Sequence, residues 1–239
     1  MNYRKLITQK NSDYEEDRHD HFVIPKDIMN SLRLSQIEKG QIILKGPVDE
    51  KMADYVQDAL MLLEMEPPKS EVVTVKISSP GGCVLSGLKI HDLLMLYSIE
   101  TGIPVRGMVI GMACSAASTF LLQGCTQRLA TENCMIMCHH ALSGLVITEH
   151  NLKSDGWRKR LLDNFADTKE KMIRILERRT GKSEQEILKL LVRAREMSTK
   201  EAFEFGLIDD IIKFEFKEQE EKPIKRYRRF SKNKGSETE

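Results

Sequence analysis

The sequence predicts an α/β fold built on a largely parallel sheet. Short runs of β-branched and apolar residues alternate with longer segments whose apolar residues recur every three or four positions. Glycine and proline pairs separate the two kinds of segment. Repeated strand–helix–strand units are typical of parallel sheets with right-handed crossovers. In such sheets the chemistry gathers in the loops beyond the carboxyl ends of the strands.

The first half of the chain supplies three strands and two helices. Asp49 stands where the N-cap of the first helix would lie, and Pro67-Pro68 ends that helix. The expected strands cover residues 41–44, 72–77 and 105–110, and the expected helices cover 48–66 and 86–100.

The second half is dominated by helices. Ser183 followed by Glu186 matches a capping box, which predicts that a new helix begins there. The expected helices cover residues 115–122, 148–180 and 199–205, and short strands are expected at 128–130, 135–138 and 207–212.

Composition places the chain among ordinary globular proteins. Its 239 residues suit one domain with a good core, and 41% of them are apolar. The formal net charge of +1 gives no overall field that would attract nucleic acid.

No apolar run approaches a membrane span, and the first twenty residues lack the apolar stretch of a signal peptide, so a cytoplasmic location is expected. The five cysteines are expected to be buried and reduced.

The two ends differ from the middle. Residues 1–20 are polar and predict a mobile arm, residues 21–216 form the folded domain, and the highly charged residues 217–239 predict a disordered tail. The basic run 225–229 could contact RNA. The neighbouring acidic residues Glu218, Glu220 and Glu221 favour a solvated tail instead.

A candidate nucleophile stands at the end of the strand 105–110. Gly111 opens a turn of small residues that leads into a helix at Ser115. Such a turn would present the serine hydroxyl at the rim of the sheet and point the amide of Ala116 at an oxyanion, although the motif is not the common G-x-S-x-G. The alternative is a serine that merely caps a buried helix.

Two further segments could complete a serine-dependent site. Gly81-Gly82 follows a strand, and amides there could stabilise an oxyanion, unless the pair is a plain turn. His139 and His140 end another strand, where only one of them can point towards Ser115, because successive side chains face opposite ways. A neutral imidazole is the common base for a serine nucleophile. A zinc site made of Cys134, Cys138, His139 and His140 is disfavoured, because sequential strand residues do not converge on a tetrahedral centre.

Taken together, these segments resemble the proteolytic subunit of the Clp protease family. The resemblance runs in order from about residue 41 to 209. It rests on Gly46-Pro47-Val48-Asp49, Ser79-Pro80-Gly81-Gly82 with Val84 and Gly87, Gly111-x-Ala113-x-Ser115, Met137-x-His139, and Glu204-Phe205-Gly206-Leu207-Ile208-Asp209.

The resemblance implies a fold and an activity. The fold would be the Clp/crotonase-type layered spiral, with parallel strands and a long handle helix. Ser115 would be the nucleophile, His139 the base, and Gly82 and Ala116 the oxyanion-hole donors. Subunits would form stacked seven-membered rings, and an AAA+ unfoldase would feed unfolded proteins or peptides to them. The resemblance calls for no cofactor and no metal.

The chain departs from the family pattern at the third catalytic position. Ala194 stands where the family has the aspartate that orients the histidine, and alanine cannot accept a hydrogen bond from imidazole. Glu196 is the nearest substitute in sequence, and Asp163 and Asp167 are more remote candidates. The spacing from Ser115 to the histidine is about one residue short, so His140 remains an alternative base.

Three functions are therefore compatible with the sequence. The leading hypothesis is a serine endopeptidase with an unusual third group or none. The second is a catalytically weakened or inactive subunit that acts structurally in mixed rings, as the alanine at position 194 suggests. The third keeps the fold but uses paired amides to hold a coenzyme A thioester enolate, as crotonase-type enzymes do.

Overall fold

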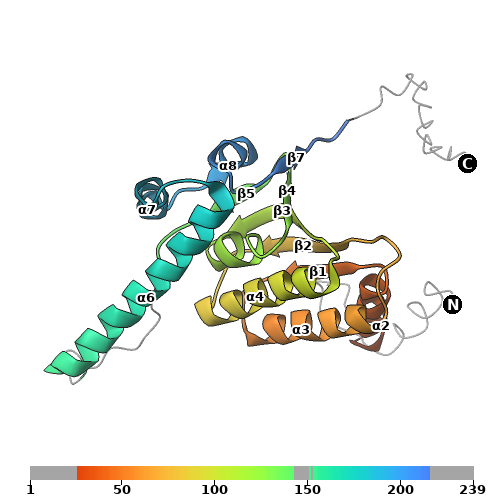
Figure 1. Ribbon diagram of the computed structural model, residues 1–239, viewed down its shortest axis with the longest axis horizontal. Helices are drawn as coiled ribbons and strands as arrows, with labels where there is room; N and C mark the ends of the chain where they lie inside the picture. The colour runs from red at the N-terminus through yellow and green to blue at the C-terminus, as the bar shows by residue number, and fades with distance from the viewer. Residues whose placement is uncertain (1–25, 143–150, 152, 216–239) are drawn as a thin grey trace, which may run out of the picture.

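The computed structural model describes residues 26–142, 151 and 153–215 (Figure 1). The expected arm 1–20 and tail 217–239, with its basic run 225–229, lie outside the described residues. So do residues 143–150, which lead into the long helix.

The fold is α/β, as predicted, and its main sheet is parallel. The strands lie side by side in the order β1-β2-β3-β4-β7. Each neighbouring pair in this order is parallel. Their bounds are β1 Gln41–Lys45, β2 Val73–Ser79, β3 Val105–Cys114, β4 Gln127–Thr131 and β7 Asp210–Ile212.

The helices surround this sheet unevenly. In Figure 1, α3 and α4 lie side by side below the sheet, while α6 projects from the body as a long rod. The helical segments are α2 Lys26–Ile37, α3 Glu50–Met65, α4 Val84–Thr101, the π-helical turn η1 Ala117–Leu121, α6 Asp155–Thr180, α7 Glu184–Arg193 and α8 Thr199–Phe205.

The helix ends follow the predicted capping chemistry. Asp49 accepts a hydrogen bond from the Met52 amide at 2.8 Å, which begins α3. Ser183 and Glu186 form the expected capping box at the start of α7. Gly206 ends α8 in the left-handed conformation that glycine adopts at little cost. Local side chains therefore define these boundaries.

The core lies between the sheet and the helices α3 and α4. Every second residue of β2 is buried, from Val73 to Ser79, with the residues between them half-buried. The helices turn apolar stripes towards this core, and α4 buries Gly87, Ile90, Leu94 and Tyr97. Burial of this apolar surface is the main force that holds the layers together.

Several elements differ from the sequence-based expectation. α2 was not expected, because every residue of this helix except Ile37 is exposed or only partly buried. The start expected near residue 148 for the handle helix lies outside the described residues. The described helix α6 begins at Asp155, where the Ser154 side chain accepts from the Trp157 amide and caps it. A short strand β6, Met197–Ser198, pairs antiparallel with β5, Met135–Met137.

β3 changes partner along its length. Residues 106–109 pair with β4, whereas Met112 to Cys114 pair with β5. The register against β2 shifts between these two stretches, and Gly111 lies there with a φ of 80°. The strand therefore bends away from β4 and brings β5 beside the turn at Ser115.

Candidate active site

Ser115 sits in a strained turn directly after β3. Its φ is 57°, in the left-handed region that a non-glycine residue seldom adopts. Two main-chain hydrogen bonds hold it: its amide donates to the Met137 carbonyl at 2.7 Å, and its carbonyl accepts from the Thr119 amide at 3.0 Å. Observed strain of this kind is common at functional sites, where the surrounding structure maintains it.

The glycine pair after β2 packs directly against this turn. An ideal Cβ on Gly81 would lie 2.5 Å from the Ser115 Cβ and 2.6 Å from the Cys114 carbonyl oxygen. One on Gly82 would lie 2.3 Å from the Val48 carbonyl oxygen. Only residues without a side chain allow these approaches.

The amides of this loop have different partners. The Gly81 amide donates to the Ser79 hydroxyl at 3.1 Å. Among the described residues, neither the Gly82 nor the Ala116 amide donates to a protein acceptor. These two amides, next to the strained serine, are the ones that the sequence nominated as oxyanion donors.

The pairing of β3 with β5 brings the histidines to the serine. Cys114 pairs with Met137, so Ser115 and the residues after Met137 leave neighbouring parallel strands at the same edge. Buried Ser118 reinforces the junction: its hydroxyl lies 2.6 Å from the Met137 carbonyl oxygen and 2.9 Å from that of Ser115. The Met137 carbonyl thus accepts from both serines.

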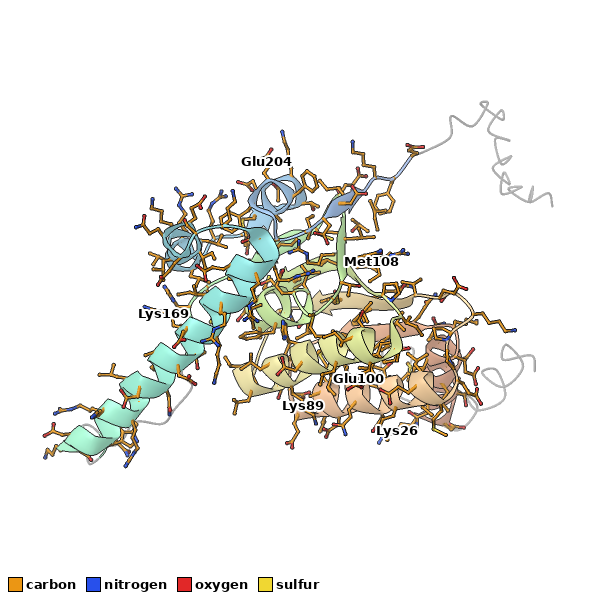
Figure 2. All side chains as sticks on the ribbon, viewed as in Figure 1. Lys26, Lys89, Glu100, Met108, Lys169 and Glu204 are labelled. Atoms are coloured by element: carbon orange, nitrogen blue, oxygen red, sulfur yellow. The ribbon has the colours of Figure 1, made fainter. Side chains whose placement is uncertain are left out.

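The two histidines differ in their surroundings. The Nδ1 atom of His139 lies 2.5 Å from the carbonyl oxygen of His140. Burial lowers the pKa of His140, and the charges of Lys169 and His139 lower it further. Lys169 lies on α6 (Figure 2). Within the described part of the chain, no hydrogen bond joins the Ser115 hydroxyl to either ring, but such bonds are often long before substrate binds.

Ala194 lies shortly before β6, the strand that pairs with β5. Ile136 pairs with Met197, and the two strands are antiparallel. The residues before Met197 therefore lie opposite the residues after Ile136. As a result His139 and Ala194 line one open hollow of about 410 Å³. The hollow is also lined by Met137, His140, Leu142, Leu191 and Val192.

The acidic candidates for the third position lie elsewhere. Asp167 pairs with Lys171 at 2.6 Å, one turn along α6. Burial raises the pKa of the Cys114 thiol and the Glu196 charge raises it further, so Glu196 lies within electrostatic reach of the residue before Ser115. Neither residue, nor the exposed Asp163, lines the hollow around His139.

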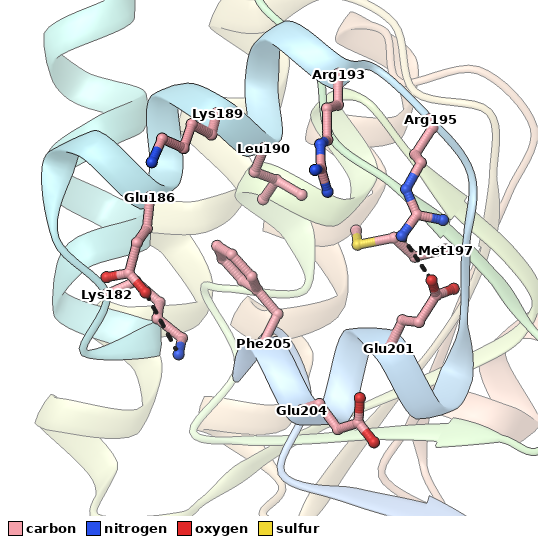
Figure 3. Close-up of a pocket in the computed structure, with 10 residues that line it drawn as sticks. All are labelled: Lys182, Glu186, Lys189, Leu190, Arg193, Arg195, Met197, Glu201, Glu204 and Phe205. Carbon is pink, nitrogen blue, oxygen red and sulfur yellow. Dashed lines mark hydrogen bonds and ion pairs between the residues drawn. The ribbon is translucent and has the colours of Figure 1, made fainter.

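A larger hollow of about 440 Å³ lies between α7 and α8 (Figure 3). Leu190, Met197 and Phe205 form its apolar part, and its lining includes neither Ser115 nor His139. An ion pair between Arg195 and Glu201, 2.6 Å apart, crosses one side. Glu201 also caps α8, so these charges serve the packing of the two helices.

The described residues hold no cluster of three or more metal-ligating side chains.

Four of the cysteines are buried, but Cys83 is exposed, contrary to the expectation that all five would be buried. Among the described helices, none combines the length and apolar character needed to cross a bilayer.

Sequence reasoning missed the roles of Ser118 and of the Met137 carbonyl. The only signal was a second serine three residues after Ser115. Its significance depends on the π-helical turn, in which the Leu122 amide donates to the Ala117 carbonyl five residues back. That geometry was not predictable from propensities.

The comparison with known families gives one match. Residues 26–215, which span most of the chain and all of its described part, match the family described as Clp protease.

Proposed function

The chain belongs to the Clp protease family, and from this premise we propose that it is a serine endopeptidase subunit with Ser115 as nucleophile and His139 as base. The observation that carries the proposal is the pairing of β3 with β5. It sets a strained serine and a histidine-bearing strand end side by side at one edge of the sheet. The match favours this reading over the coenzyme A alternative.

The proposed mechanism is acyl transfer. The Ser115 oxygen attacks the carbonyl carbon of the peptide bond while His139 takes the hydroxyl proton. The C–N bond then breaks, and His139 gives that proton to the departing amine. Water attacks the acyl-serine with the histidine again as base, which releases the second peptide product and restores the serine.

The amides of Gly82 and Ala116 are the proposed oxyanion donors. Neither is used by another protein acceptor among the described residues, and Gly81 is occupied by Ser79. One such donor contributes about 3 kcal/mol to the transition state in comparable enzymes. Their fixed positions mean that no reorganisation is needed as the charge develops.

Family membership also supports an assembly. Members of this family form rings with themselves and work with AAA+ unfoldases, and we propose the same for this chain, with unfolded proteins or peptides as substrates. Stacked heptamers and a cytoplasmic location remain predictions from the sequence.

A specific observation favours a second candidate. Ala194 leaves the hollow beside His139 without a carboxylate, and loss of the orienting acid can lower turnover by about 10⁴. A weakened subunit that acts structurally in mixed rings would fit this departure.

Labelling with a fluorophosphonate tests the proposal. The purified, assembled protein is treated with the probe, and mass spectrometry locates the modified residue. We expect the label on Ser115, its loss in Ser115→Ala and in His139→Gln, and its retention in His140→Gln. The exposed Ser31 on α2 provides a matched control, Ser31→Ala, which should label as the unchanged protein does.

Each other outcome has a definite meaning. A folded, assembled protein without label supports the structural subunit and contradicts the peptidase. A label that persists in His139→Gln but disappears in His140→Gln identifies His140 as the base. Peptide hydrolysis that survives Ser115→Ala excludes Ser115 as the nucleophile.

A further inference from the structure

The contact between His139 and its own neighbour specifies a tautomer. A carbonyl oxygen can only accept a hydrogen bond, so the Nδ1 atom of His139, 2.5 Å from the His140 oxygen, must carry a proton. In a neutral imidazole the other nitrogen, Nε2, is then unprotonated. This is the form that can take a proton from a serine hydroxyl, and it is the form that an aspartate enforces in a serine triad.

No acidic side chain competes for this proton in the described structure. Ala194 lines the same hollow as His139, and no carboxylate lines that hollow. The one hydrogen bond of the His139 ring among the described residues goes to the His140 carbonyl oxygen. The acceptor of the Nδ1 proton is therefore the main chain.

We propose that the main-chain carbonyl of His140 is the positioning group of His139, so that the site works as Ser115, His139 and a neutral carbonyl. The proposal rests on the function assigned above to Ser115 and His139. It explains how a chain with alanine at position 194 can keep a correctly oriented base.

A neutral acceptor supplies orientation without charge. It fixes the ring and its tautomer, but it stabilises the imidazolium formed during acylation less than a carboxylate would. The geometric part of the missing aspartate's role is thus retained, and the electrostatic part is absent. These two parts can be measured separately.

The tautomer is measured first, by nitrogen NMR of the full-length, assembled protein labelled with [¹⁵N]histidine. The chain has six histidines, and His139→Gln identifies the signals of this ring by their loss. The neutral ring should show a protonated Nδ1 and a bare Nε2. A protonated Nε2 in the neutral ring would overturn the proposal, whether or not the protein hydrolyses peptides.

Kinetics of two variants at position 194 provide the second test. Ala194 has a φ of 47°, a conformation that aspartate and asparagine both tolerate better than alanine, so Ala194→Asn controls for the backbone. In Ala194→Asp the acid limb of the profile of kcat/KM against pH should move up by about one pH unit or more, because of the added charge. In Ala194→Asn it should stay in place.

The size of the rate change decides between the alternatives. If the carbonyl already orients His139, Ala194→Asp should raise kcat by less than about 10-fold. A gain on the order of 10³ to 10⁴ would show that the histidine had lacked orientation and would overturn the proposal. A protein without hydrolysis or labelling in any form contradicts the peptidase function, and the NMR measurement then still decides the orientation of the ring.

Discussion

At the scale of single residues, the site depends on backbone conformations that few side chains allow. Ser115 and Ala194 both have positive φ without being glycine. Each such residue costs on the order of 1–3 kcal/mol, which the surrounding packing must offset. For Ser115 the compensation is visible in its bonds to Met137 and Thr119. For Ala194 it is a single capping bond from its amide to the Leu190 carbonyl at 3.3 Å.

Gly81→Ala should disable Ser115, the proposed nucleophile. The added methyl group would lie 2.5 Å from the Ser115 Cβ and 2.6 Å from the Cys114 carbonyl oxygen, which is a steric clash. The φ of 96° is itself unfavourable for alanine. We expect the rate of fluorophosphonate labelling to fall by at least about 100-fold, since small displacements of reacting groups have effects of that order. Stability should fall by about 1–3 kcal/mol in thermal or denaturant unfolding.

Gly156→Ala is the matched control for this substitution. Gly156 is exposed in the first turn of α6, and an added Cβ there would have no neighbour within 4 Å. The change should leave labelling unaltered and raise stability by up to about 1 kcal/mol. If Gly81→Ala labels at the rate of this control, the close packing of the glycine loop on Ser115 does not matter for the chemistry.

At the scale of elements, the last strand is held to the sheet by a charged pair. Arg128 of β4 is 5% exposed. It donates to Asp209, which precedes β7, and also to the Gln123 side chain and the Gly206 carbonyl. The Asp209 carboxylate accepts from the Arg128 amide as well, at 2.7 Å. The Asp209 carboxylate thus links the residue before β7 to β4, and the Arg128 guanidinium links β4 to the end of α8.

The Asp209 pair predicts a loss of stability in acid. Burial opposes ionisation of Asp209, but the hydrogen bonds and charge of Arg128 outweigh it, so its pKa lies below the usual value. A carboxyl with a lowered pKa in the folded protein adds stability above its unfolded pKa of about 3.9, and that stability disappears as the pH falls through the folded pKa. Stability should therefore decrease below about pH 4.

Asp209→Asn should remove this dependence. The variant should lose about 1–3 kcal/mol at pH 7, because the buried Arg128 guanidinium loses its carboxylate, and its stability should change less between pH 5 and 3. Urea unfolding at several pH values measures both effects. Asp58→Asn, on the exposed side of α3, should behave as the unchanged protein. A variant with the full acid sensitivity of the original would show that other carboxyls cause it.

How far the elements could be predicted depends on where their causes lie. Asp49, Ser183 and Gly206 act within one helical turn, so the boundaries they determine were correct. The bend of β3 depends on contacts with β5, residues 135–137, which follow far along the chain. The sequence thus showed Ser115 and His139 at strand ends, but not which strands become neighbours, nor that His140 would offer its carbonyl.

At the scale of the whole molecule, a chain without partners leaves apolar surface uncovered. On α4, Leu85, Leu96 and Ile99 are exposed and recur at intervals that place them on one helix face. On α6, which projects from the body (Figure 1), Leu162 is also exposed. Clustered apolar surface of this kind commonly marks a protein interface. It fits the self-assembly proposed from family membership.

Ile99→Asp should weaken self-association. A carboxylate on this face would lose hydration on assembly without gaining a partner. The oligomer of the variant should therefore dissociate at higher protein concentrations than the original oligomer does. Sedimentation velocity over a range of concentrations measures this. The side chain is 70% exposed, so the fold of the subunit should stay within about 0.5 kcal/mol of the original stability. Gln57→Asp on α3 adds the same charge at another exposed site and should assemble normally; equal assembly of both variants would exclude this face of α4 from the interface.

The hollow beside His139 also bears on inhibitor selectivity. Relatives with an aspartate at this position would fill part of the volume that Ala194 leaves open, and they would line it with negative charge. Consider a serine-directed acylating compound that places a small apolar branch in this hollow. In this chain the branch would contact Leu191 and Val192, whereas in such relatives it would contact a carboxylate. With Ser115 as the proposed nucleophile, the alanine offers a steric and electrostatic basis for compounds that react with this subunit and spare relatives with an aspartate there.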